Sequence, residues 1–159
     1  MKTLIVYDSF FGNTEKIAQA IGNSLGSKED VETLRVSDIK FEQLIGLELI
    51  IVGSPTRVFK PTKAIMNFLN KIPLDSLKGV KVAAFDTRIS TVDVNSRFLN
   101  ILVKLFGYAA KPIADKLEKK GGSLIIPPEG FFVKDSEGPL KDGEPERAAD
   151  WAKLIMKKI

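Results

Sequence analysis

The 159-residue sequence contains no cysteine and no histidine. Without cysteine, the chain has no disulfide bond, no thiolate nucleophile and no cysteine-ligated iron–sulfur cluster. Without histidine, it lacks the side chain most often used as a general base near neutral pH and a principal zinc ligand. Imidazole catalysis and zinc sites of the usual ligands are therefore excluded, and redox chemistry requires a bound cofactor.

Long apolar runs are also missing, since no stretch reaches the roughly 18 apolar residues that a membrane span needs, and no secretory leader is visible. The net charge of +4 is dispersed, with Lys and Arg interleaved with Asp and Glu. No segment forms the basic stripe with interleaved aromatic residues that a nucleic-acid interface needs. We expect a cytoplasmic protein without a nucleic-acid partner, folded as one domain over residues 1–159.

The stretch from Lys2 to Leu25 reads as a strand, a short polar turn and a helix. Residues 4–7 form a continuous apolar run, which is typical of a central parallel strand buried on both faces. Apolar residues then recur at helical spacing from Ile17 to Leu25. Between the two lies the turn Ser9–Thr14, in which Gly12 can adopt unusual dihedrals and Gly12 or Asn13 can cap the following helix.

This turn is suited to holding a phosphate group. A helix N-terminus presents free amide donors and a partial positive charge, and Ser9 and Thr14 add hydroxyl donors. A strand–turn–helix corner also needs a glycine and a polar cap for structural reasons alone, and the two explanations have equal weight. The sequence contains neither GxxxxGK[ST] nor GxGxxG, so it does not favour a nucleotide triphosphatase or a dinucleotide-binding protein.

Further strands alternate with helical patterns along the rest of the chain. Strands are predicted at residues 31–36, 49–52, 80–85 and 124–126, with a short outer extension at 131–133. A short helix or turn is predicted at 38–44, and longer helices from near Pro61 to Ile72, over 99–106, from Pro112 to Lys120, and from Pro145 onwards with Trp151 in the core. This alternation predicts the α/β class, with one doubly wound, five-stranded parallel sheet covered by helices on both faces.

Three polar loops follow the first, third and fourth strands, at residues 9–14, 54–60 and 86–97. Ligands of open parallel sheets bind at the carboxyl ends of the strands, where the strand order reverses. In the order 2-1-3-4-5 these three strands are neighbours across that reversal. The loops are therefore expected to face one crevice.

The segments SFFGNTE, GSPTRVFKPT and DTR in these loops resemble the flavodoxin family, and the resemblance covers essentially the whole chain. It implies a flavodoxin-like fold that binds flavin mononucleotide (FMN), with the first loop around the phosphate and the other two beside the isoalloxazine ring. The run Pro55–Phe59 is also similar to a loop of flavodoxin-like quinone reductases. The resemblance therefore leaves open an electron carrier and a small flavin-dependent reductase.

The resemblance assigns fifteen residues to the cofactor. They are Ser9, Gly12, Asn13 and Thr14 with the amides of Phe10 and Phe11 at the phosphate, Ser54, Pro55 and Thr56 at the ribityl chain and ring, Arg57, Val58 and Phe59 beside the ring, and Asp86, Thr87 and Arg88 on its other side. The chain departs from the family at three points: Phe11 replaces a phosphate-loop hydroxyl, the third-strand loop has no Trp, and the fourth-strand loop lacks the usual Tyr.

Two other classes of function remain open. One is a binding module with the same fold and no catalysis. The other is a receiver-like signalling domain, which needs an acidic cluster after the first strand and a phosphoacceptor Asp after the third. Here Asp8 stands alone and the third strand ends in Gly-Ser-Pro, which disfavours the receiver.

Residues 54–60 contain no glycine, and the β-branched Val58 is expected to resist a positive φ. Arg57 and Arg88, where they reach the pyrimidine end of the ring, would favour negative charge there. On both grounds two-electron or anionic chemistry, and hence a reductase, is favoured over a dedicated one-electron carrier. The expected partners are a redox protein or a reduced nicotinamide donor, because Arg57, Lys60, Arg88 and Arg97 favour an anionic partner. The dense apolar content of residues 97–106 leaves open a cap over the flavin, a homodimer contact or a helix buried between the sheet and the following helix, and it favours the buried helix.

Overall fold

A computed structural model describes residues 1–27, 29–90 and 96–159. All of the strands lie in one sheet, and every strand pair in it is parallel. The strands are β1 (Thr3–Tyr7), β2 (Val31–Arg35), β3 (Leu49–Pro55), β4 (Lys81–Ile89), β5 (Ser123–Leu124) and β6 (Glu129–Val133). Their order is β2-β1-β3-β4-β5, with β6 also paired to β4, so the predicted fold class and strand order are confirmed.

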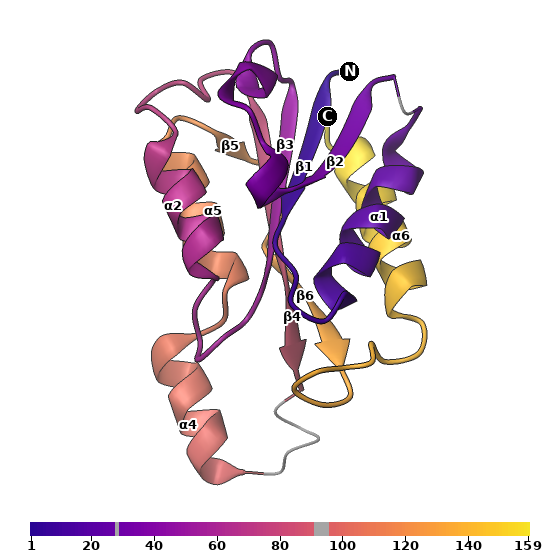
Figure 1. Ribbon diagram of the computed structural model, residues 1–159, viewed down its shortest axis with the longest axis vertical. Coiled ribbons are helices and arrows are strands. Elements are labelled where there is room, and N and C mark those ends of the chain that lie inside the picture. The colour runs from indigo at the N-terminus through magenta and orange to yellow at the C-terminus, as the bar shows by residue number, and fades with distance from the viewer. Residues whose placement is uncertain (28, 91–95) are drawn as a thin grey trace.

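Helices cover both faces of this sheet (Figure 1). The helices are α1 (Asn13–Leu25), α2 (Lys63–Lys71), α4 (Arg97–Phe106), α5 (Ala110–Lys119) and α6 (Glu144–Met156), with the 3-10 turns η1 (Val36–Asp38) and η2 (Phe41–Leu44) after β2. Helices α1 and α6 pack on one face, and α2 and α5 pack on the other. In the described part of the chain, no helix combines the length and the apolar character that a membrane crossing requires.

The sheet separates two apolar cores, because alternate residues of each strand point to opposite faces. Ile5 and Ile51 point into the core under α1 and α6, whereas Val6 and Val52 point into the core under α2 and α5. The first core also contains Trp151, which is 4% exposed, as predicted for this residue.

The fifth position of the sheet is shared by two short strands. β5 pairs with the start of β4, at Lys81 and Val82, whereas β6 pairs with its end, from Phe85 to Ile89. The predicted strand at 124–126 therefore ends earlier than expected, since Pro127 and Pro128 interrupt the ladder before β6 resumes it. As a result, β6 extends the sheet edge to the carboxyl end of β4.

The predicted break between two helices is confirmed, since Gly107 ends α4 with a φ of 70° and α5 begins at Ala110. The two helices lie in different places. α5 packs on the sheet beside α2, whereas α4 projects beyond the carboxyl ends of the strands, at the bottom of Figure 1. Both termini lie at the opposite end of the sheet.

The Phe85 side chain on β4 packs so closely over the backbone of β3 that position 53 requires glycine. Gly53 pairs with Phe85 in the ladder, and a Cβ atom added to Gly53 would lie 2.0 Å from Cζ of the Phe85 ring. That ring lies across β3 and makes edge-to-face contacts with Phe131 and Trp151, at centroid distances of 6.0 and 6.3 Å. Because residue 53 is a glycine, the aromatic cluster can pack against β3 directly before the loop that follows this strand.

We expect Gly53→Ala to lower the free energy of unfolding by about 1–3 kcal/mol, because the buried Phe85 ring has no free space to move into. Urea denaturation of Gly53→Ala, Phe85→Leu and the double variant measures the coupling. The double variant should be less destabilised than the sum of the two single variants. Additive effects would show that the ring does not restrict residue 53.

Candidate functional site

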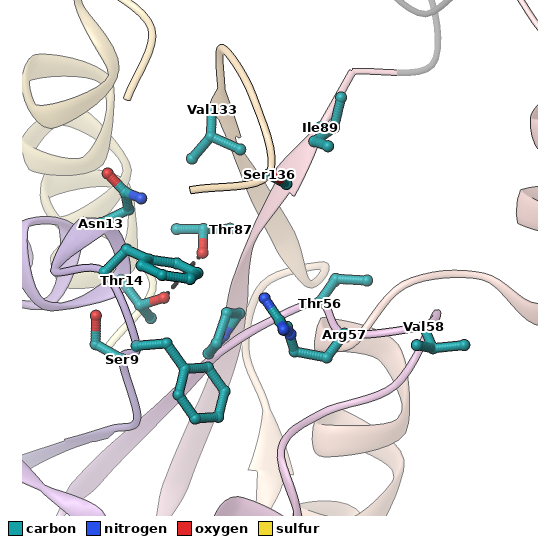
Figure 2. A pocket seen from close by; sticks show the side chains of 13 residues that line it. Ser9, Asn13, Thr14, Thr56, Arg57, Val58, Thr87, Ile89, Val133 and Ser136 are labelled. Carbon is teal, nitrogen blue, oxygen red and sulfur yellow. Dashed lines mark hydrogen bonds between the residues drawn. The ribbon is translucent and has the colours of Figure 1, made fainter. Parts of the chain in front are cut away.

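A cavity of about 320 Å³ opens at the carboxyl ends of the central strands. Its walls come from the turn before α1, the loop after β3, the end of β4 and the segment after β6, as Figure 2 shows. This is the position predicted from the strand order. The cavity therefore gathers segments that are far apart in the sequence.

Ten of the fifteen residues predicted to bind the cofactor line this cavity. They are Ser9, Phe10, Phe11, Asn13, Thr14, Pro55, Thr56, Arg57, Val58 and Thr87. The other five do not line it: Gly12, Ser54, Phe59, Asp86 and Arg88. Three residues that were not predicted line it as well: Ile89, Val133 and Ser136.

The turn before α1 is fixed by hydrogen bonds within itself. The Ser9 hydroxyl accepts the amide of Gly12 at 3.0 Å, and the Asp8 carboxylate accepts the amide of Ser9 at 2.9 Å. Gly12 is the N-cap of α1, with a φ of 84° that disfavours residues with a Cβ, and no side chain caps the helix. Asn13 does not cap the helix either, because its side chain donates to the carbonyl of Glu137 at 3.0 Å.

The backbone amides of this turn are available to a ligand. Phe10, Phe11, Asn13 and Thr14 donate no backbone N–H hydrogen bond to any residue that the structure describes. The first amides of a helix have no partner within the helix, and they carry its partial positive charge. Since Ser9 and Asn13 are buried beside the cavity, the turn holds these donors in an arrangement that suits an anion.

A buried hydroxyl pair joins the turn to the sheet. Thr14 Oγ1 and Thr87 Oγ1 lie 2.8 Å apart, and the two residues are 1% and 5% exposed (Figure 2). Each hydroxyl can donate one hydrogen bond and accept others, so the pair retains capacity for a ligand oxygen in the cavity. The pair also fixes the start of α1 relative to the end of β4.

Cationic and aromatic side chains cover another wall. The Arg57 guanidinium lies 5.3 Å from the ring centre of Phe10 and 5.9 Å from that of Phe11. Both rings are largely exposed, at 60% and 48%. Guanidinium and phenyl groups both stack on flat rings, so this wall suits a planar ligand with an anionic tail.

The loop after β3 contradicts one expectation. Val58 has a φ of 47° and Phe59 a φ of 65°, so the β-branched residue that was expected to resist a positive φ adopts one. Arg57 and Lys60 exchange both backbone hydrogen bonds, at 2.9 and 3.0 Å, which closes a tight turn around the two strained residues. Left-handed conformations cost about 1–2 kcal/mol for such residues. The lack of glycine therefore does not exclude positive φ here, and the backbone part of the argument for two-electron chemistry loses its premise.

Asp86 and Arg88 differ from the expectation that they face the crevice. Alternation along β4 directs Thr87 and Ile89 into the cavity and the other two residues toward α5. There Arg88 donates two bonds to Asp86, at 2.6 and 2.7 Å, while its guanidinium stacks 3.7 Å from the Tyr108 ring centre. Asp86 also accepts the Ala110 amide at 2.8 Å. Burial raises the pKa of the Asp86 carboxyl, whereas Arg88 and the Ala110 amide act in the opposite direction.

The unpredicted residues come from two sources. Ile89 follows Thr87 by two positions, so strand alternation was a usable signal for it. Val133 and Ser136 belong to the end of β6 and the segment after it, which no motif indicates. The Asn13–Glu137 bond holds this segment against α1, and Gly138 fits there because a Cβ would lie 2.5 Å from the Asn13 side chain.

Comparisons with known proteins agree with this geometry. A flavodoxin domain family model matches residues 4–123. The chain is 30% identical to a flavodoxin from Maridesulfovibrio salexigens, and the alignment covers 99% of each sequence.

Solved structures show the same architecture. A flavodoxin from the domain Archaea has a TM-score of 0.77 and 28% identity, with 99% of this chain and 98% of that chain covered. Flavodoxin 2 from Bacillus cereus has a TM-score of 0.76 and 25% identity over the full length of both chains. The fold is therefore that of a recognised group of proteins.

The buried carboxylate beneath the site yields a stability prediction. Asp86→Ala should lower the free energy of unfolding by about 3–5 kcal/mol, because it leaves Arg88 and the Ala110 amide without their partner. Asp115→Ala is the matched control, since the Lys111–Asp115 pair on α5 is exposed and contributes about 0.2–0.5 kcal/mol. Urea denaturation measures both values, and equal losses for the two variants would contradict the role of Asp86.

Proposed function

The chain belongs to the flavodoxin family, and from this premise we propose that it binds one FMN in the carboxyl-edge cavity and transfers electrons through it. Flavodoxins are flavin-binding electron-transfer proteins. Our proposal goes further than the family: it names FMN as the flavin, the cavity as its position and the residues that hold it. The observation that carries it is the set of unpaired amides on the turn before α1, beside two buried threonine hydroxyls.

The phosphate of FMN fits this turn by its chemistry. A phosphate dianion needs several donors, and the turn supplies the amides of residues 10, 11, 13 and 14 and the hydroxyl of Thr14. Gly12 holds the turn open in its left-handed conformation, and an added Cβ would meet no protein atom within 4 Å. The role assigned to Gly12 is therefore conformational, since it lets the neighbouring amides converge.

The isoalloxazine ring is placed against Arg57, Val58 and the end of β4. Arg57 offers a flat cation to the ring, and Thr56 and Ile89 form the floor of the cavity between the two loops. When bound, FMN supplies the electron-accepting and electron-donating group. The protein orients it, excludes water from one side and leaves the other side open to a redox protein or a reduced nicotinamide.

The Thr14 hydroxyl provides a test that is specific for the phosphate. Thr14→Val should raise the Kd for FMN by roughly 10- to 150-fold, because a hydrogen bond to a charged group contributes about 1.5–3 kcal/mol. The same variant should leave the Kd for riboflavin unchanged, since riboflavin has no phosphate. Fluorescence titration of the flavin-free protein measures both constants.

Thr33→Val on β2 is the matched control, because Thr33 lies on the other side of α1, against Gly22, and should leave both constants unchanged. If Thr14→Val lowers the affinity for FMN and riboflavin equally, the phosphate does not lie at this turn. If neither flavin binds the wild-type protein, the proposed function is wrong.

A further inference from the structure

Helix α4 exposes a row of large apolar side chains, Phe98, Ile101 and Leu105, which we call the outer stripe. These residues are 72%, 56% and 71% exposed. They are spaced three and four residues apart, so they lie on one side of the helix. A folded chain rarely leaves three such neighbours in water without an interaction that covers them.

The inner side of α4 already supplies apolar contacts that hold the helix against the body of the protein. At 100° per residue, Leu99 and Val103 lie on the side of the helix opposite the outer stripe. They line a second cavity of about 200 Å³ together with Val58 and Tyr108. The outer stripe is therefore additional to the apolar side chains that hold α4 against the body of the protein.

Helix α4, which carries the outer stripe, lies beside the proposed flavin site. The second cavity shares Thr56, Val58 and Ile89 with the cavity of the site, so α4 borders the two loops that would flank the ring. Val58, at the tip of the loop after β3, is itself 85% exposed. In Figure 1, α4 projects past the carboxyl ends of the strands, where a partner can reach both the helix and the site.

The charged residues that the structure describes on α4 and on the loop after β3 are all cations. The sequence contains no Asp or Glu from residue 49 to 74 or from residue 96 to 114, whereas the first segment carries Arg57 and Lys60 and the second carries Arg97 and Lys104. All four cations are exposed. None of them pairs with a carboxylate in the described part of the chain. An apolar patch bordered by cations that have no carboxylate partner among the described residues complements an apolar patch bordered by carboxylates.

We propose that the outer stripe and these four cations form the docking surface for an acidic redox protein. The proposal rests on the proposed function, because it places the electron-exchange partner over the exposed side of the flavin site. The stripe supplies apolar contact area, and the cations steer the approach and set the orientation.

Charge argues against two other occupants. A second copy of this chain would bring the same unpaired cations together across a two-fold axis. An anionic membrane that met this end of the molecule would also face Asp135 and Glu137, which are exposed on either side of the cavity-lining Ser136. A protein partner can present carboxylates to one wall only, which matches this asymmetry.

The experiment compares two labelled redox proteins of opposite charge, an acidic plant-type ferredoxin and basic cytochrome c, by fluorescence anisotropy. The full chain is titrated into each, with and without FMN. We expect the acidic probe to bind more tightly than the basic one, and its affinity to fall about tenfold or more as the salt concentration rises from about 20 to about 300 mM.

Two pairs of variants separate charge from apolar contact. Arg97→Glu/Lys104→Glu should invert the preference between the two probes. Ile101→Ser/Leu105→Ser should weaken binding of the acidic probe about tenfold while keeping its salt dependence. The matched controls are Lys157→Glu/Lys158→Glu, which lie at the other end of the molecule, and Leu154→Ser/Met156→Ser on α6. Circular dichroism confirms that each variant is folded.

Three outcomes overturn the proposal. The first is a wild-type protein that prefers the basic probe or shows no preference. The second is an equal effect of the α4 variants and the control variants. The third is loss of a homodimer in sedimentation, or of binding to phosphatidylserine vesicles, in Ile101→Ser/Leu105→Ser while probe binding is unchanged. Binding of the acidic probe by a chain that takes up no FMN would support the docking surface and refute only the proposed function.

Discussion

The first turn of α1 must find partners for backbone amides that no helix can satisfy from within. The fold leaves these amides beside a cavity, and several contacts keep them in that position. Gly12 takes a left-handed conformation, Ser9 pins the Gly12 amide, and Thr14 is held by Thr87 on β4. The parallel sheet brings the loop after β3 to the same edge, which makes the cavity a consequence of strand direction.

Much of this was readable from the sequence because it depends on local patterns. Continuous apolar runs marked β1, β3 and β4 as buried parallel strands, and their polar ends predicted most of the cavity wall, from Ser9 to Thr87. The resemblance to the flavodoxin family, based on those loops, was confirmed by the comparisons. The direction of the side chains at the end of β4 was missed because residues 86–89 were predicted as loop, whereas β4 continues to Ile89 and places Asp86 and Arg88 on the face opposite Thr87.

The remaining differences arise from tertiary contacts. Val58 adopts a left-handed conformation because the paired backbone of Arg57 and Lys60 closes the turn around it, and tertiary pairing overrides the preference of a β-branched residue. Val133 and Ser136 reach the cavity because β6 continues the ladder that β5 leaves incomplete. Neither effect has a signature within a few residues of the position concerned.

The placement of the two chain ends has a practical consequence for engineering. Both termini lie at the amino edge of the sheet, across the molecule from the cavity and from α4 (Figure 1). A fluorescent protein, an affinity tag or a surface anchor fused to either end would leave the carboxyl edge accessible to ligands and protein partners. The same geometry allows the chain to be immobilised on an electrode through one terminus with the cavity directed toward the solution.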